Sequence, residues 1–383
     1  MALKSQEIIK DMNYHNVLER IISEGYISRA DLAKKLGLTK ATISSLVQEL
    51  LDENLILEVG ALETSKGRRP IQLTFHASYG YVISADIRLN SINFLLSDMI
   101  GRHCYLRQYG WDGSKERLLD LLHTGISHMR ANAPDTEKGL IGICLAIHGT
   151  VFESQVIFTP YYDLDGLNLQ ESLHKAFQAP VYLENEANLA ALGERTFSFQ
   201  SSNMLNINVH SGIGLGVIVN DQLYVGKNGF AGEFGHTIVN PAGIPCPCGN
   251  QGCIEQYASE KAILKKYNHL KNDGSYTADQ LIAAYHHEES EAITVMKDFI
   301  QYISIGINNA INIFNPDFIV INSIFTSQIS GLIHKIKKQL KNRMAGNCTI
   351  VPSTLQDTAS LLGGVYVCSK SYLKINELSP PLV

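Results

Sequence analysis

The 383-residue sequence has neither a long apolar run nor a large excess of charge of one sign. No segment approaches the roughly 18 apolar residues of a membrane span, and the N-terminus lacks the apolar core of a signal peptide. We therefore expect a cytoplasmic protein with no membrane partner. The formal net charge of −5 and the pI near 6.2 argue against an overall basic coat for nucleic acid, although a local basic patch can exist within a neutral average.

Cysteine is scarce, and three of the seven cysteines lie in the short stretch "CPCGNQGC". In a reducing compartment this spacing favours metal ligands over disulfide partners. The remaining cysteines lie in apolar contexts, where we expect them to pack: Cys104, Cys144, Cys348 and Cys368. With 45% hydrophobic and 18% charged residues, the chain is expected to form two or three globular domains.

A histidine shortly before this stretch completes a pattern H-x9-C-x-C-x4-C, formed by His236, Cys246, Cys248 and Cys253. One nitrogen and three sulfurs are the ligand set of a closed, structural Zn²⁺ site, without the open position that catalysis needs. The alternative is that these are unrelated buried or free side chains. We favour zinc because the intervening prolines and glycines leave the loop little core of its own. The metal would hold Glu233 and Glu255 close together.

Residues 1–78 have the pattern of a DNA-binding head. Apolar residues between positions 17 and 22 recur at helical spacing, and "SRADLAKKLGLTKATISSLVQELLDENLI" predicts two further helices joined by the tight connection "LGLT". Ser28 with Asp31 forms a capping-box pattern, and Thr39 is a natural N-cap for the next helix. The stretch "ILEVGALETSKGRRPIQLTFH" then predicts two strands around a turn. Together these elements indicate a winged helix-turn-helix.

The second helix of that motif separates an apolar face from a polar one. An inward stripe is formed by Ile43, Leu46, Val47 and Leu50. Small polar side chains on the other face suit insertion into the major groove of double-stranded DNA. The alternative is a helical interaction domain with ordinary solvated charges. We predict DNA contacts from Ser28, Arg29, Thr39, Lys40, Ala41, Thr42, Ser44, Ser45 and Gln48, and from Lys66, Arg68 and Arg69 in the wing.

Beyond residue 78 strands and helices alternate, and the pattern repeats weakly. "YVISADIRLNSINFLLSD" and "MLNINVHSGIGLGVIVND" each predict strand, turn, strand, and a helix and a further strand follow later in each case. Two related α/β lobes, residues 79–200 and 201–383, would enclose a cleft suited to a small ligand. This division leaves open that the C-terminal helix packs back on the first lobe. The glycines of "SGIGLG" either cradle phosphates or form a tight turn between strands, and the first copy has none.

A second polar cluster occurs in "YLENEANLAALGE", where a predicted strand runs into a helix. Its carboxylates and amides suit a polyhydroxylated ligand, because each sugar hydroxyl both donates and accepts hydrogen bonds. The alternative is that Asn185 or Glu186 simply caps the helix.

These stretches resemble the ROK family of repressors and sugar kinases, which have an actin-like, ribonuclease H-like two-lobed fold. The resemblance covers essentially the whole chain and is most specific in "GEFGHTIVNPAGIPCPCGNQGCIE", "ENEANLAALGE" and the head with "GRRP". "ENEAN" and "GIGLGVIVNDQLY" are most similar to the xylose repressors of Gram-positive bacteria. The resemblance implies a sugar site at Gly149, Asn185, Glu186, Glu233, His236 and Glu255, with the second ring nitrogen of His236 turned toward the sugar.

Departures from the kinase pattern favour a repressor over an enzyme. Kinases of the family have Asp-x-Gly-Gly-Thr where this chain has "DIRLN" at residues 86–90, and an aspartate base where it has Glu186. Losing a phosphate loop should impair phosphoryl transfer more than one extra methylene on the base. His148 replaces the usual proline before Gly149, and Tyr161 stands where relatives tend to have asparagine, so xylose is an informed guess.

We therefore expect a non-enzymatic, sugar-responsive repressor that binds a palindromic operator as a homodimer or a dimer of dimers. A monosaccharide, xylose first among them, would bind in the cleft and release or modulate the repressor. The alternative is an ATP-dependent ROK sugar kinase with an appended DNA-binding head. A constitutive DNA-binding protein with a degenerate sensor is a third class.

Overall fold

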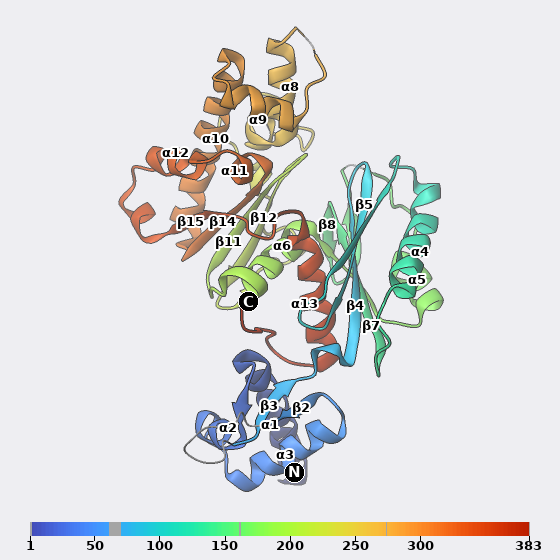
Figure 1. Cartoon of the computed structure of the whole chain (residues 1–383). Helices are drawn as coiled ribbons and strands as arrows, with labels where there is room; N and C mark the ends of the chain where they lie inside the picture. The colour runs from blue at the N-terminus through green and yellow to red at the C-terminus, as the bar shows by residue number, and fades with distance from the viewer. Residues whose placement is uncertain (1, 61–69, 161, 273, 383) are drawn as a thin grey trace. The chain divides into compact units, whose positions relative to one another are not determined.

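The structure is a computed structural model and describes residues 2–60, 70–160, 162–272 and 274–382 (Figure 1). The chain divides into two compact units. The first runs to Glu184 and resumes at Leu361, and the second comprises Asn185–Ser360. Among the described residues, no helix combines the length and the apolar composition that crossing a bilayer requires.

This division differs from the predicted lobe limits at one helix, and it groups the C-terminal helix with the first unit, which the prediction left open. Helix α6 (Glu186–Glu194) groups with the second unit, because it packs on strands of that unit. Helix α13 (Ala359–Leu373) belongs from Leu361 onward to the first unit. The division does not separate residues 1–78 from the lobe that follows them. The three-part organisation into a head and two lobes therefore stays a prediction.

The described part of the head contains three helices and a small antiparallel sheet of order β1-β3-β2. The core is formed by the apolar faces of the helices, with Leu18, Ile21 and Leu32 fully buried. The elements are α1 (Ala2–Glu24), β1 (Ile27–Ser28), α2 (Arg29–Leu36), α3 (Lys40–Asp52), β2 (Ile56–Val59) and β3 (Gln72–Phe75). The predicted pair of strands after the second helix is confirmed as β2 and β3.

Side-chain caps set the starts of α2 and α3. The hydroxyl of Ser28 accepts the N–H of Asp31 at 3.1 Å, and the hydroxyl of Thr39 accepts the N–H of Thr42 at 3.2 Å. Both predicted caps are confirmed. Helix α3 buries the predicted stripe, and its buried residues are Ile43, Leu46, Val47 and Leu50.

The first unit also contains a five-stranded sheet of order β10-β7-β4-β5-β6. Strands β4 and β5 form an antiparallel hairpin, and β7 returns through α4 to pair parallel with β4. The elements are β4 (Gly80–Ile87), β5 (Ser91–Asp98), β6 (Tyr105–Gly110), α4 (Lys115–Ala131), β7 (Gly139–Ile147), β8 (Thr150–Phe152), β9 (Gln155–Phe158), α5 (Leu169–Phe177) and β10 (Val181–Asn185), with the 3₁₀ turn η1 (Ala77–Tyr79) before them.

The second unit contains a five-stranded sheet of order β13-β12-β11-β14-β15. Its hairpin is β11 and β12, and β14 pairs parallel with β11 after the long helix α10. The strands are β11 (Met204–Val209), β12 (Ile213–Val219), β13 (Gln222–Leu223), β14 (Phe318–Ser323) and β15 (Thr349–Pro352). The helices are α7 (Glu255–Ala258), α8 (Glu260–Leu270), α9 (Ala278–His286), α10 (Ser290–Phe314), α11 (Ile324–Gln328) and α12 (Leu332–Gln339), with the shorter turns η2 (Arg195–Phe199), η3 (Phe234–His236), η4 (Arg343–Asn347) and η5 (Gln356–Thr358).

The two larger sheets share one topology. Each begins with an antiparallel hairpin, and each adds a parallel strand beside the first strand of that hairpin. The weak repeat in the sequence is therefore a structural repeat. Each sheet has its own core, around Phe94 in the first unit and around Phe299 in the second.

The glycines of "SGIGLG" serve helix packing at two positions. Gly214 and Gly216 lie within β12, and α6 crosses them closely. A Cβ at Gly214 would lie 2.8 Å from the Cβ of Ala187, and one at Gly216 would lie 2.3 Å from the Cβ of Ala191. The sequence allowed either a phosphate cradle or a tight turn at this stretch. Close packing against α6 explains Gly214 and Gly216 without a phosphate cradle.

Gly216→Ala should therefore destabilise the second unit. The added methyl meets both the Cβ of Ala191 and, at 2.4 Å, the carbonyl oxygen of Ala187, so the free energy of unfolding should fall by about 1–3 kcal/mol. Urea unfolding measures the change. Gly346→Ala is the control, since no atom lies within 4 Å of a Cβ built there. Equal stability of the two variants would contradict the packing role.

Candidate functional site

The second unit brings together the four residues of the H-x9-C-x-C-x4-C pattern. Their possible ligand atoms all lie within 4.8 Å of one another. The Sγ atoms of Cys248 and Cys253 are 3.7 Å apart, and the Sγ of Cys246 is 3.6 Å from Nδ1 of His236. Cys253 is fully buried, whereas Cys248 is exposed. The cluster could hold a metal ion.

The backbone between these residues forms compact turns. The backbone of Cys253 forms an antiparallel β-bridge with that of Ile238. Gly252 has φ +78°, and a Cβ at this position would lie 1.7 Å from the carbonyl oxygen of Asn240. Only glycine fits there. Without a metal, burial and the neighbouring thiols raise the pKa of Cys253 to about 12. A bound cation would favour the thiolate forms of the three cysteines, which are the forms that coordinate a metal.

His236 connects this cluster to a carboxylate. Its Nδ1 faces Cys246, and its Nε2 lies 3.8 Å from Oε2 of Glu233, three residues earlier in the chain. The two ring nitrogens thus face different side chains, and the sugar contact of the second nitrogen stays a prediction. Glu255 follows the last cysteine and starts α7. Its Oε2 accepts the backbone N–H of Ile213 at 3.0 Å, which ties the carboxylate to the first residue of β12.

The β10–α6 junction also contacts this hairpin. Asn185 is the N-cap of α6, and its Oδ1 accepts the N–H of Asn188 at 3.1 Å. The capping alternative is thus correct for this side-chain oxygen. Glu186 accepts a hydrogen bond at Oε1 from Nδ2 of Asn208 at 2.9 Å. Asn208 pairs with Gly214 across the hairpin, one rung from Ile213, so Glu186 and Glu255 both hydrogen-bond near the β11–β12 turn.

Gly149 lies in the first unit, between β7 and β8. A Cβ there would lie 2.3 Å from the carbonyl oxygen of Phe158, so close backbone approach accounts for the glycine. Its proposed part in sugar binding stays a prediction.

A cluster of charged side chains in the first unit was not foreseen from the sequence. Asp86, at the end of β4, accepts Nε of Arg88 at 2.8 Å and lies 2.9 Å from Nε2 of His148, at the end of β7. Asp86 is fully buried. Burial alone raises the pKa of the Asp86 carboxyl, but the neighbouring Arg88 and His148 outweigh it and hold that pKa well below its usual value.

The predicted DNA-contacting residues differ in their exposure and in their contacts. Lys40, Ala41, Ser44 and Ser45 are exposed on α3, as is Gln48, whose amide donates to Asp52 at 2.8 Å. Ser28 is a correction, because it is 1% exposed and its hydroxyl caps α2. Arg29 pairs with Glu58 at 2.7 Å, and Thr39 and Thr42 form the N-terminal cap of α3. The wing residues Lys66, Arg68 and Arg69 lie outside the described residues. Tyr161 also lies outside them.

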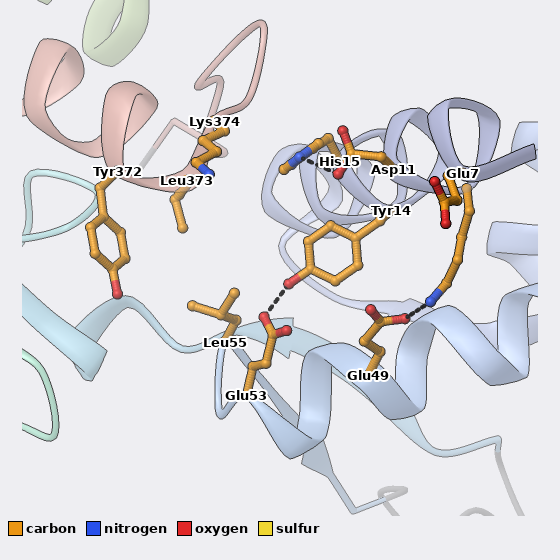
Figure 2. Close-up of a pocket in the computed structure, with 11 residues that line it drawn as sticks. Glu7, Asp11, Tyr14, His15, Glu49, Glu53, Leu55, Tyr372, Leu373 and Lys374 are labelled. Atoms are coloured by element: carbon orange, nitrogen blue, oxygen red, sulfur yellow. Dashed lines mark hydrogen bonds and ion pairs between the residues drawn. The ribbon is translucent and has the colours of Figure 1, made fainter. Parts of the chain in front are cut away.

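A pocket of about 670 Å³ opens between α1, the end of α3 and the end of α13 (Figure 2). Charged groups line it and pair within it. Lys10 binds Glu49 at 2.8 Å, and the hydroxyl of Tyr14 donates to Glu53. Nearby, the carboxylate of Glu19 accepts the backbone N–H of Glu377 at 3.3 Å. The residues that line the pocket come from opposite ends of the chain. No local sequence pattern could therefore have predicted these contacts between the head and the C-terminal segment.

Asp86→Asn should lower the free energy of unfolding at pH 7 by about 2 kcal/mol, because Arg88 and His148 lose the carboxylate that both contact. The loss is moderate because both side chains are partly exposed to water. A carboxyl whose pKa is lowered by folding stabilises fully above its unfolded pKa of about 3.9, and that contribution shrinks as the pH falls below it. Urea unfolding from pH 7 to pH 3 measures the difference from the wild type. Asp135→Asn, at an exposed position, is the control. A pH-independent difference would contradict the assignment.

Comparisons with known proteins agree with this architecture. A family model described as ROK family matches residues 82–371, and one described as winged helix-turn-helix DNA-binding matches residues 15–56. The chain is 33% identical over 390 residues to a protein named xylose repressor from Bacillus spizizenii, and the match covers 99% of this chain and 100% of that relative.

Two solved structures are similar to the whole chain or to its larger part. One, described as a ROK family transcriptional regulator and homolog of the E. coli MLC protein, has a TM-score of 0.81 and 26% identity over 95% of this chain and 97% of its own. The other, a ROK family glucokinase from Streptomyces griseus in complex with glucose and AMPPNP, has a TM-score of 0.67 and 22% identity over 75% of this chain and 99% of its own, which shows the fold alone. The chain therefore belongs to the ROK family and carries an N-terminal winged helix-turn-helix domain.

Proposed function

We propose that the protein is a sugar-responsive transcriptional repressor whose head binds a palindromic operator. Its effector is a monosaccharide, and D-xylose is the first candidate because the relative from Bacillus spizizenii is named a xylose repressor. The observation that carries the proposal is the position of His236, whose ring lies between a metal-binding cluster and Glu233 in a chain with a winged helix-turn-helix head.

The exposed face of α3 supplies the DNA-reading surface. Lys40 at its first turn suits a phosphate contact, and Ser44 and Ser45 are short enough to let the helix approach base edges. The cations of the wing add phosphate contacts. Two heads in a homodimer would reach half-sites about 34–36 Å apart, which is why we propose a palindromic operator.

Zn²⁺ is the metal that the cluster fits best. Zn–S bonds of about 2.3 Å and Zn–N bonds of about 2.0 Å place tetrahedral ligand atoms about 3.5–3.8 Å apart. The S–S distance of 3.7 Å and the S–N distance of 3.6 Å lie in this range. Three thiols and an imidazole leave no open position, so the ion would be structural and would hold the segment from Glu233 to Glu255.

Carboxylates and amides around the β11–β12 hairpin supply the sugar site. Glu233 and Nε2 of His236 lie on one segment, and Glu255 and Glu186 each bond to the hairpin. Asn185 and the backbone at Gly149 complete the proposed set. Five or six sugar hydrogen bonds of about 1 kcal/mol each approach the roughly 5.5 kcal/mol that shifts a two-state balance from 1:99 to 99:1.

A ROK sugar kinase with an appended head is the second candidate, supported by the kinase fold of the neighbouring structures. The Asp86–Arg88–His148 cluster weighs against it. The turn after β4 has no glycine to bring backbone N–H groups to a phosphate, and Arg88 in that turn is paired with Asp86. The protein is therefore proposed to act by binding rather than by catalysis.

Fluorescence anisotropy with a duplex that the wild type selects from a randomised DNA pool tests this function. Saturating D-xylose should weaken DNA binding at least about tenfold, and no ATP should be consumed. Glu233→Gln should keep the affinity for DNA but need more D-xylose for release, because one sugar acceptor is weakened. Glu288→Gln, an exposed change in the same unit, should behave as the wild type. DNA affinity unaffected by sugars, or ATP turnover of about 1 per second or more with them, would contradict the proposal.

Zinc removal tests the structural role of the cluster. Elemental analysis should find about one Zn²⁺ per chain in the wild type and in Cys104→Ser, whose thiol lies outside the cluster, but almost none in Cys253→Ser. The metal-free protein should bind D-xylose at least about tenfold more weakly, because His236 loses the partner that orients its ring. Full zinc content in Cys253→Ser, or unchanged sugar affinity after chelation, would refute this role.

A further inference from the structure

Strand β11 buries two asparagine side chains in the second unit. Asn206 and Asn208 are 0% and 1% exposed. Because they are two residues apart on a strand, they point to the same face of the sheet, while Leu205, Ile207 and Val209 between and beside them pack in the hydrophobic core. Two amides at the centre of a sheet require an explanation, since apolar side chains would be buried there at lower cost.

The hydrogen bonds of these amides run in one direction. Nδ2 of Asn206 donates to Oδ1 of Asn208 at 2.9 Å, and Nδ2 of Asn208 donates to Oε1 of Glu186 at 2.9 Å. The carboxylate of Glu186 fixes the orientation of the Asn208 amide. If that amide were rotated by 180°, its oxygen would face Oε1 of Glu186 and repel it. The series ends on the acid, and hydrogen bonds aligned in this way strengthen one another.

The glycines of β12 make this contact possible. Across the hairpin Asn206 pairs with Gly216 and Asn208 with Gly214, so no side chain stands beside either amide on that strand. Helix α6 therefore lies close enough for the short side chain of Asn208 to reach Glu186 at its first position. The same close packing that excludes a Cβ at Gly216 thus sets the distance between the amide and the acid.

We propose that Asn208, held by Asn206, is a positioning residue that orients Glu186 for its hydroxyl contacts with the sugar. The inference rests on the proposed sugar site. A buried amide that donates to the carboxylate fixes its rotamer before the sugar arrives. Loss of the amide removes one of the hydrogen bonds that orient this carboxylate before the sugar arrives, so affinity falls although Asn208 touches no ligand.

Calorimetric titration with D-xylose tests this, with urea unfolding to follow stability. Asn208→Leu should weaken binding about tenfold, the usual effect of removing a donor from a charged acceptor. Asn206→Leu should weaken it less, and the double variant should equal Asn208→Leu, because Asn206 acts through Asn208. In a Glu186→Gln background Asn208→Leu should add almost nothing. If the leucine variant does not fold, Asn208→Ala, which only removes atoms, replaces it.

Asn322 provides the matched control. It is 5% exposed on β14, directly beside Asn208 in register, but its Nδ2 donates to the carbonyl oxygen of Gln356 at 3.1 Å. Asn322→Leu should change stability and leave D-xylose affinity within about twofold. An equal loss of affinity in Asn322→Leu, additive effects with Glu186→Gln, or unchanged affinity in Asn208→Leu would each overturn the positioning role. Failure of the wild type to bind D-xylose would instead overturn the sugar site on which that role depends.

Discussion

The imidazole of His236 is the group on which the proposed sugar site depends. Its Nδ1 lies 3.6 Å from a cysteine sulfur of the metal-binding cluster, and its Nε2 lies 3.8 Å from Glu233. A ring whose one nitrogen is fixed by a metal has a defined orientation and a defined tautomer at the other. The loop around it is rich in prolines and glycines, so in the proposed site a metal, rather than a hydrophobic core, would set the geometry.

The β11–β12 hairpin is the second fixed part of the site. Helix α6 packs directly on its glycines, Glu186 bonds to Asn208 on one strand, and Glu255 bonds to the first residue of the other. Two glycines of this hairpin, Gly214 and Gly216, serve helix packing. The equivalent hairpin of the first unit carries Arg88 and Asp86 joined by an ion pair. Both hairpins thus carry structural contacts, helix packing in the second unit and an ion pair in the first.

Local signals in the sequence predicted much of the head and the metal cluster. Ser28 and Thr39 were identifiable as caps because capping is decided within four residues, and the stripe on α3 because helical spacing is local. The four metal-binding residues lie within a short segment. The repeat of hairpin, helix and strand was visible for the same reason, since each copy keeps its own periodicity.

Contacts between distant segments were not predictable in this way. Asp86 and His148 are 62 residues apart, and Asn208 reaches Glu186 across 22. The burial of Asn206 and Asn208 on β11 could not be predicted from the sequence, because asparagine in a strand is polar whether it is buried or exposed. Ser28 was misjudged as a DNA contact since the pattern that marks a cap does not show that the cap is buried.

Diffraction at the zinc absorption edge, from crystals grown with D-xylose, tests the central claim most directly. The account predicts one anomalous peak bonded to Nδ1 of His236 and the Sγ atoms of Cys246, Cys248 and Cys253, with a sugar hydroxyl on Nε2 of the same ring. A cluster without metal, or a sugar bound away from that nitrogen, would contradict it.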